Sequence, residues 1–171
     1  MKVLMTLFLF ALGVNAASLD DLGYTTTGGK VIITNCDEAA TGVLMIPQII
    51  EGNPVTSIGE QAFGNCFSLT NITIPDSIVS IGNQTFESCY SLTNITLPDG
   101  LTSIGRAAFA ECTSLTSITI PDIVTSIGFG CFTGSPITDL EIPSRPEIIL
   151  AGPDKQFGSE DDMSSQKDSQ N

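Results

Sequence analysis

The sequence predicts a solenoid, a stack of short coils in which each coil contacts only its neighbours. The main observation is a repeat of constant length, with three copies following one another without a gap at residues 55–77, 78–100 and 101–123. These copies read VTSIGEQAFGNCFSLTNITIPDS, IVSIGNQTFESCYSLTNITLPDG and LTSIGRAAFAECTSLTSITIPDI. A second observation is that the units at both ends of the array are less regular than the inner ones, which is typical of a capped stack.

Each copy contains one run that favours a β-strand. The pattern L-x-x-I-x-I is too short for a helix, alternates at its end and is rich in Ile and Thr. A proline ends each run because it lacks the N–H that a parallel ladder needs, and the aspartate that follows most of them favours a turn. The prolines recur at nearly equal intervals, except that the first interval is longer because residues 48–53 are inserted. They are Pro47, Pro75, Pro98, Pro121 and Pro143.

The rest of each coil is predicted to be a second short extended piece followed by a helical turn. Residues 78–82 form the extended piece, with Gly82 allowing the bend, and residues 84–89 form one helical turn on the outer side. Phe86 then points inward, and four phenylalanines at the same repeat position stack as a spine. They are Phe63, Phe86, Phe109 and Phe132. The predicted class is an α/β-type solenoid, mostly β with short helical turns.

The two ends of the chain differ from the repeats in composition. Residues 1–16 resemble a signal peptide, with Lys2 before an apolar stretch and small residues at 14–16 for cleavage. The alternative is a membrane anchor, but the apolar stretch is short of the ~20 residues that span a bilayer. Residues 144–171 are polar and acidic and are expected to form a disordered tail.

A hairpin is expected at the N-terminal end of the stack. Residues 24–27 and 30–35 are β-prone runs that flank Gly28 and Gly29. Such a hairpin covers the first open edge, which would otherwise pair with other chains. The predicted domain therefore spans residues 24–143, with the cap at 24–46 and the repeats at 47–143.

The composition excludes several classes of function. The net charge of −13, from 19 acidic and 6 basic residues, argues against nucleic acid and anionic membranes as partners. The chain has no histidine, which removes the usual general base and most zinc sites. We therefore predict no enzyme activity, no cofactor and no metal, and no membrane insertion after removal of the signal peptide.

The repeat itself resembles a known family. The string [VL]TSIG-xx-AF-xx-C-xSLT-x-ITIPD, repeated over residues 55–143, resembles the BspA-like, or Treponema-type, leucine-rich repeats, and the resemblance extends back to residue 24. It implies a right-handed leucine-rich-repeat stack with short parallel strands on its concave side, in secreted or cell-surface proteins that bind proteins or cells. It supplies no catalytic motif. The chain departs from the widespread leucine-rich pattern in having proline where that pattern has asparagine, so the internal asparagine ladder should be missing.

Two columns of residues need an interpretation. Asp76, Asp99 and Asp122 occupy the same position in successive copies and are interpreted as turn residues, with a calcium site as the alternative. The five cysteines show no C-x-x-C pair and are interpreted as small buried residues. Because neighbouring coils lie ~4.8 Å apart, a disulfide between coils remains an alternative. The cysteines are Cys36, Cys66, Cys89, Cys112 and Cys131.

The candidate binding site is the exposed side of the proline-terminated strands. Polar residues there alternate with buried Ile and Leu and would line the concave sheet, where a protein or another cell-surface macromolecule could bind. The alternatives are an ordinary solvated strand face and a structural or truncated array with no specific ligand. The acidity indicates a basic patch on the partner or serves solubility. The candidate residues are Asn71, Thr73, Asn94, Thr96, Ser117, Thr119, Asp139 and Glu141.

Overall fold

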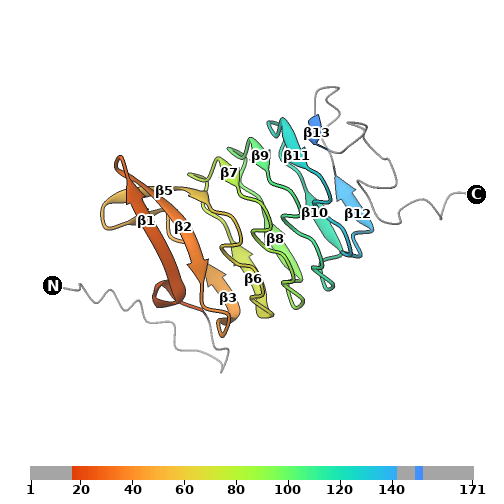
Figure 1. Ribbon diagram of the computed structural model, residues 1–171, viewed down its shortest axis with the longest axis horizontal. Coiled ribbons are helices and arrows are strands. Elements are labelled where there is room, and N and C mark those ends of the chain that lie inside the picture. Colours follow the sequence, from red (N-terminus) through yellow and green to blue (C-terminus); the bar gives the residue numbers. More distant parts are fainter. Residues whose placement is uncertain (1–16, 142–148, 152–171) are drawn as a thin grey trace, which may run out of the picture.

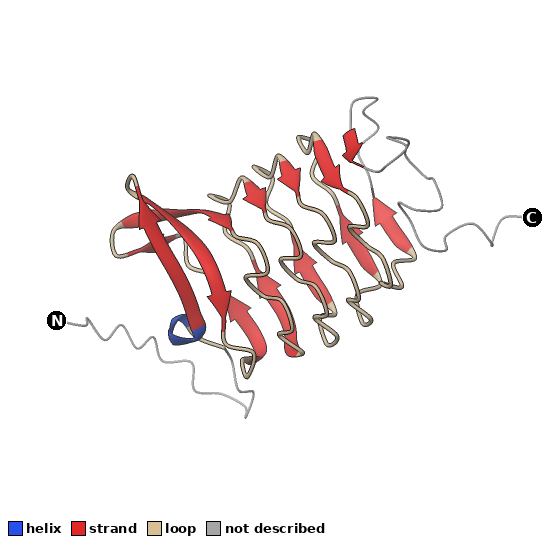
Figure 2. Cartoon of the chain, viewed as in Figure 1, coloured by secondary structure: helices blue, strands red, loops and turns tan. Residues whose placement is uncertain are grey.

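The structure is a computed structural model that describes residues 17–141 and 149–151. Its coils lie side by side along one axis, from the hairpin β1–β2 to the strands β12 and β13 (Figure 1). Strands and turns make up nearly all of it (Figure 2). The predicted solenoid with parallel strands is confirmed.

One sheet runs the whole length of the stack. Its path begins with an antiparallel pair and continues as parallel strands, each contributed by the next coil. In order, its strands are β1 (Leu22–Thr27), β2 (Lys30–Cys36), β5 (Asn53–Ile58), β7 (Ser80–Ile81), β9 (Ser103–Ile104), β11 (Ser126–Gly128) and β13 (Ile149–Ala151). The segment expected to be a minor extended piece is therefore the strand that links all coils.

The proline-terminated runs form the second parallel array. It consists of β3 (Thr41–Met45), β6 (Ser68–Thr73), β8 (Asn94–Thr96), β10 (Ser117–Thr119) and β12 (Asp139–Glu141). Strands β3, β6 and β8 pair with each other, β10 pairs with β12, and β8 lies beside β10 (Figure 1). The register follows the repeat, since Asn71 is opposite Asn94 and Thr73 is opposite Thr96.

The predicted N-terminal hairpin is confirmed. Strands β1 and β2 are joined at Gly28 and Gly29, which both have positive φ, and β2 covers β5, the first strand of the parallel ladder. The insertion at residues 48–53 makes a second small hairpin, in which β4 (Ile49–Ile50) pairs antiparallel with β5.

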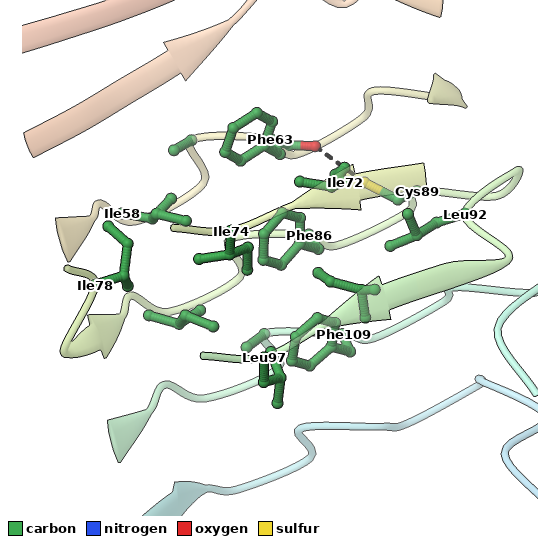
Figure 3. Packing of buried hydrophobic residues seen from close by; sticks show 14 of the residues in the cluster. Ile58, Phe63, Ile72, Ile74, Ile78, Phe86, Cys89, Leu92, Leu97 and Phe109 are labelled. Atoms are coloured by element: carbon green, nitrogen blue, oxygen red, sulfur yellow. Dashed lines mark hydrogen bonds between the residues drawn. The ribbon is translucent and has the colours of Figure 1, made fainter. Parts of the chain in front are cut away.

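The predicted phenylalanine spine is confirmed and forms the centre of the core. Phe63, Phe86 and Phe109 are fully buried, with ring centroids 5.2 Å apart between neighbours (Figure 3). Phe132 continues the stack at 5.8 Å from Phe109. Because no single coil can bury its own Phe, the aromatic column depends on the presence of adjacent coils.

The prediction of helical turns is wrong. In each coil, two residues four positions apart have positive φ, which breaks a right-handed helix. The central N–H of each turn donates to the next coil instead of along the same segment, as Phe63 N does to Thr85 O at 2.8 Å and Phe86 N to Ala108 O at 2.8 Å. The residues with positive φ are Gln61 and Asn65, Gln84 and Ser88, Ala107 and Glu111, and Gly130 and Gly134. In the described part of the chain, the one helix is a 3-10 turn at Leu19–Asp21, capped by Ser18.

The two chain ends differ from the rest. The predicted signal peptide at residues 1–16 lies outside the described residues, as does most of the predicted tail. Three residues assigned to the tail, Ile149–Ala151, form β13 and pair with β11, so the stack reaches past Pro143. Among the described residues, the structure contains no helix with the length and apolarity needed to cross a bilayer.

Candidate functional site

The predicted site residues lie together on one face of the second array, which we call the ladder face. The residues between them, such as Ile72, Ile95 and Ile118, are buried, so the alternation places the candidates on the opposite, outer side. Neighbouring rungs are ~4.8 Å apart. The face consists of Val43, Met45, Asn71, Thr73, Asn94, Thr96, Ser117, Thr119 and Asp139, and Glu141 takes the next position on β12, opposite Thr119.

The chemistry of the ladder face changes along the stack. On β3 it is apolar, with Val43 exposed and Met45 71% exposed. On β6, β8 and β10 it is formed by amide and hydroxyl groups, and on β12 it carries Asp139. Val43 and Met45 were not among the predicted residues, although the alternation in VLMIP already placed them in line with Asn71 and Thr73.

A stacked aromatic pair flanks this face and was also missed. Phe67 and Tyr90 occupy the same repeat position, in the turns before β6 and before Asn94 of β8. Their ring centroids are 5.2 Å apart with an interplanar angle of 12°, yet the residues are 42% and 45% exposed. The available signal was an aromatic residue directly after the column cysteine in two successive copies. Exposed aromatics of this kind are enriched in protein interfaces.

The charge of the described surface is strongly one-sided. Lys30 and Arg106 are the only basic residues in the described part of the chain, against many Asp and Glu residues. An acidic surface speeds the approach of basic partners and repels anionic ones.

Comparison with known protein families identifies the family of this chain. The pattern described as "BspA type Leucine rich repeat region" matches residues 43–153 in 6 copies. The chain belongs to this family of leucine-rich repeat proteins. The resemblance noted in the sequence is therefore confirmed, and the match continues through β13.

Solved structures of other leucine-rich repeat proteins are similar to this BspA-type chain. One from Bacteroides ovatus has 32% identity and a TM-score of 0.67, over 79% of this chain and 37% of its own. One from Bacteroides capillosus has 30% identity and a TM-score of 0.64, over 81% of this chain and 99% of its own. One from T. pallidum has 26% identity and a TM-score of 0.62, over 75% of this chain and 72% of its own. The matched part thus spans little more than a third of the Bacteroides ovatus protein, and comparison with curated protein sequences finds no match.

The aspartate column of the BspA-type repeats lies in turns. Asp76, Asp99 and Asp122 are exposed and each directly follows a strand-ending proline. Across residues 17–141 and 149–151, no three or more Asp, Glu or Cys side chains are grouped so as to hold a metal ion. The calcium alternative therefore has no support from the geometry.

Cysteines of the column donate hydrogen bonds to backbone carbonyl oxygens of the preceding coil. Cys89 Sγ donates to Phe63 O at 3.2 Å (Figure 3), and Cys112 Sγ donates to Phe86 O at 3.1 Å. Ser135 occupies the same position in the next coil, and its Oγ donates to Phe109 O at 2.6 Å. All five cysteines are buried, so the interpretation as small buried residues is confirmed.

The buried thiols make stability fall at alkaline pH. Burial raises the pKa of Cys112 to about 12 and also raises the pKa of Cys89 and Cys131. The folded pKa lies above that of an unfolded thiol, about 8.5. The stabilising contribution of the neutral thiol is therefore complete below about pH 8.5 and is lost as the pH rises toward the folded value.

We expect the urea midpoint of the reduced protein to fall steadily from about pH 8.5 to about pH 11. In Cys112→Ser the slope should be shallower, because a hydroxyl can donate to Phe86 O, as Ser135 does to Phe109 O, without titrating. Equal slopes for the two proteins would contradict this account.

Proposed function

We propose that the protein binds another protein through the ladder face and the adjacent pair Phe67–Tyr90. The observation that carries this proposal is the exposed aromatic pair in the turns before β6 and β8, next to the polar rungs. The core does not require these side chains, since the same repeat position holds Thr113 and Pro136 in the later coils. Burying these large exposed rings against a partner would remove their apolar surface from water, which favours binding.

The fold supports binding because it holds these groups rigidly. The strands position Asn and Thr side chains at a regular spacing along the array, so few rotamers need ordering when a partner binds. Amide and hydroxyl groups on the middle rungs can donate and accept hydrogen bonds. At the β12 end, Asp139 favours a Lys or Arg side chain of the partner.

The proposal also covers where the protein is located and what type of function it has. We propose that the protein is secreted or displayed at the cell surface and mediates adhesion or protein recognition, without being an enzyme. The signal-like residues 1–16, the absence of histidine from the sequence and the family of leucine-rich repeat proteins support this view. The alternative remains a structural array with no specific ligand.

A site-specific crosslinking experiment tests the proposal. A photoreactive phenylalanine analogue replaces Phe67 in one sample and Val79, an exposed residue directly before β7 of the other sheet, in a matched control. Crosslinking to one and the same protein from position 67 but not from position 79 is the expected result. Crosslinks from position 79 alone would place the interface elsewhere, and none from either position would favour the structural alternative.

The identified partner then allows affinity to be measured with purified proteins. Because exposed aromatics often dominate binding energy, the double variant Phe67→Ala/Tyr90→Ala should weaken binding by about 10- to 100-fold. The control Val79→Ala should bind as the unchanged protein does. Equal affinity of the aromatic double variant and the unchanged protein would remove this pair from the binding surface.

A further inference from the structure

The first cysteine of the column differs from the others. Cys89, Cys112 and Ser135 each donate to the carbonyl of the phenylalanine in the preceding coil, at 2.6–3.2 Å. Cys66 lies in the coil next to the N-terminal cap, and the cap at residues 24–46 contains no phenylalanine whose carbonyl group could accept its bond. Its Sγ instead lies 3.9 Å from Asp37 O, a long distance for a hydrogen bond.

A second thiol lies at the same place. Cys36, the last residue of β2, stands outside the repeat pattern and is buried. Its Sγ lies 3.7 Å from Asp37 O, so two thiols from segments far apart in the sequence converge on one carbonyl oxygen. The Cys66 thiol is also the largest of the causes that raise the pKa of Cys36, as expected for neighbouring thiols.

The donor role that explains the other column members does not explain this pair. The two S···O distances, 3.7 and 3.9 Å, are longer than the 3.2 and 3.1 Å of Cys89 and Cys112, and one oxygen faces two thiols. Two buried thiols that both lie within 4 Å of one oxygen, at the junction of two structural units, are instead candidates for a covalent link.

We propose that Cys36 and Cys66 form a disulfide bond that joins the N-terminal hairpin to the first coil. The two thiols give up two electrons and two protons, and a small disulfide such as oxidised glutathione accepts them. One cysteine thiolate attacks that disulfide and releases one glutathione thiolate, and the second cysteine thiolate then attacks the mixed disulfide and releases the other. Because both sites are buried in the folded state, the exchange takes place while the chain is folding.

The bond has a structural consequence. It closes the loop from residue 36 to residue 66, which contains β3, β4 and β5. It therefore fixes the hairpin that covers the open edge of the stack, and it accounts for the odd number of cysteines by leaving Cys89, Cys112 and Cys131 reduced. Such a bond requires an oxidising compartment, which agrees with the proposed export but is tested independently of it.

Oxidative refolding of the full chain tests the proposal. The reduced chain is refolded in a mixture of reduced and oxidised glutathione, and its free thiols are alkylated in denaturant. We expect three alkylated cysteines of the five. Cleavage after glutamate separates Cys36, Cys66 and Cys89, because Glu38, Glu60 and Glu87 lie between them. The expected product is one linked pair of peptides, which contains Cys36 and Cys66.

Matched variants complete the experiment. Cys36→Ser should leave all four remaining thiols free, whereas the control Cys89→Ser should keep the linked peptide pair and two free thiols. Reduction of the unchanged protein should lower its Tm by about 10 °C, a shift that Cys36→Ser does not show. Five free thiols after refolding, or a link between any other two cysteines, would overturn the proposal even if a variant fails to fold.

Discussion

Replacement of Gly105 by alanine should lower the free energy of unfolding by about 3–5 kcal/mol. An added Cβ would lie 2.5 Å from the backbone nitrogen of Asn83 and still closer to the carbonyl group of Gly82. These are backbone atoms of the preceding coil and cannot rotate away as a side chain could. The ladder bonds from Gly105 N to Ile81 O and from Gly82 N to Ile58 O, both 2.9 Å, hold the coils at this distance.

The same repeat offers a matched control. At Gly64 an added Cβ would lie no closer than 3.3 Å to another atom, and later coils carry Glu87, Ala110 and Thr133 at this position. Gly64→Ala should therefore change the free energy of unfolding by less than about 1 kcal/mol. Urea unfolding of both variants, monitored by circular dichroism, measures the difference between their free energies of unfolding. A Gly105→Ala protein as stable as Gly64→Ala would show that the coils can move apart at little cost.

Replacement of Phe86 by alanine should cost about 3–5 kcal/mol. Phe86 is fully buried and stacks on both Phe63 and Phe109, with centroids 5.2 Å away on each side. Its removal leaves a cavity between two coils that the ladder bonds keep from collapsing. Because each coil is stabilised by its neighbours, the loss should also broaden the unfolding transition as the two halves of the stack separate.

Phe67→Ala is the control for this second prediction. Phe67 stacks on Tyr90 at the same centroid distance of 5.2 Å, but it is 42% exposed. Its truncation should cost less than about 1 kcal/mol, because little apolar surface returns to water. If both truncations cost the same, burial between coils would not be the source of the stability of the aromatic column.

The candidate site was predictable where it follows the strand period. The alternation of Ile72 with Asn71 and Thr73 is local, so the sequence alone places the polar residues on one face. Phe67 and Tyr90 were missed because an aromatic residue in a turn can point either into the core or into solvent. Only the packing of neighbouring coils determines which of these occurs.

The sequence by itself determined the stack, its parallel strands, the buried phenylalanine column and the N-terminal hairpin. These features follow from the spacing of apolar residues, which is the same in each copy and does not depend on details of contact. Only the tertiary structure decided the conformation of the turns at residues 84–89 and the approach of the Cys36 and Cys66 thiols to Asp37 O. The physical reason is that the central N–H of each turn and the thiols of Cys66, Cys89 and Cys112 find their partners in the preceding or following unit of the stack, so these partners are set by the distance between units rather than by local preference.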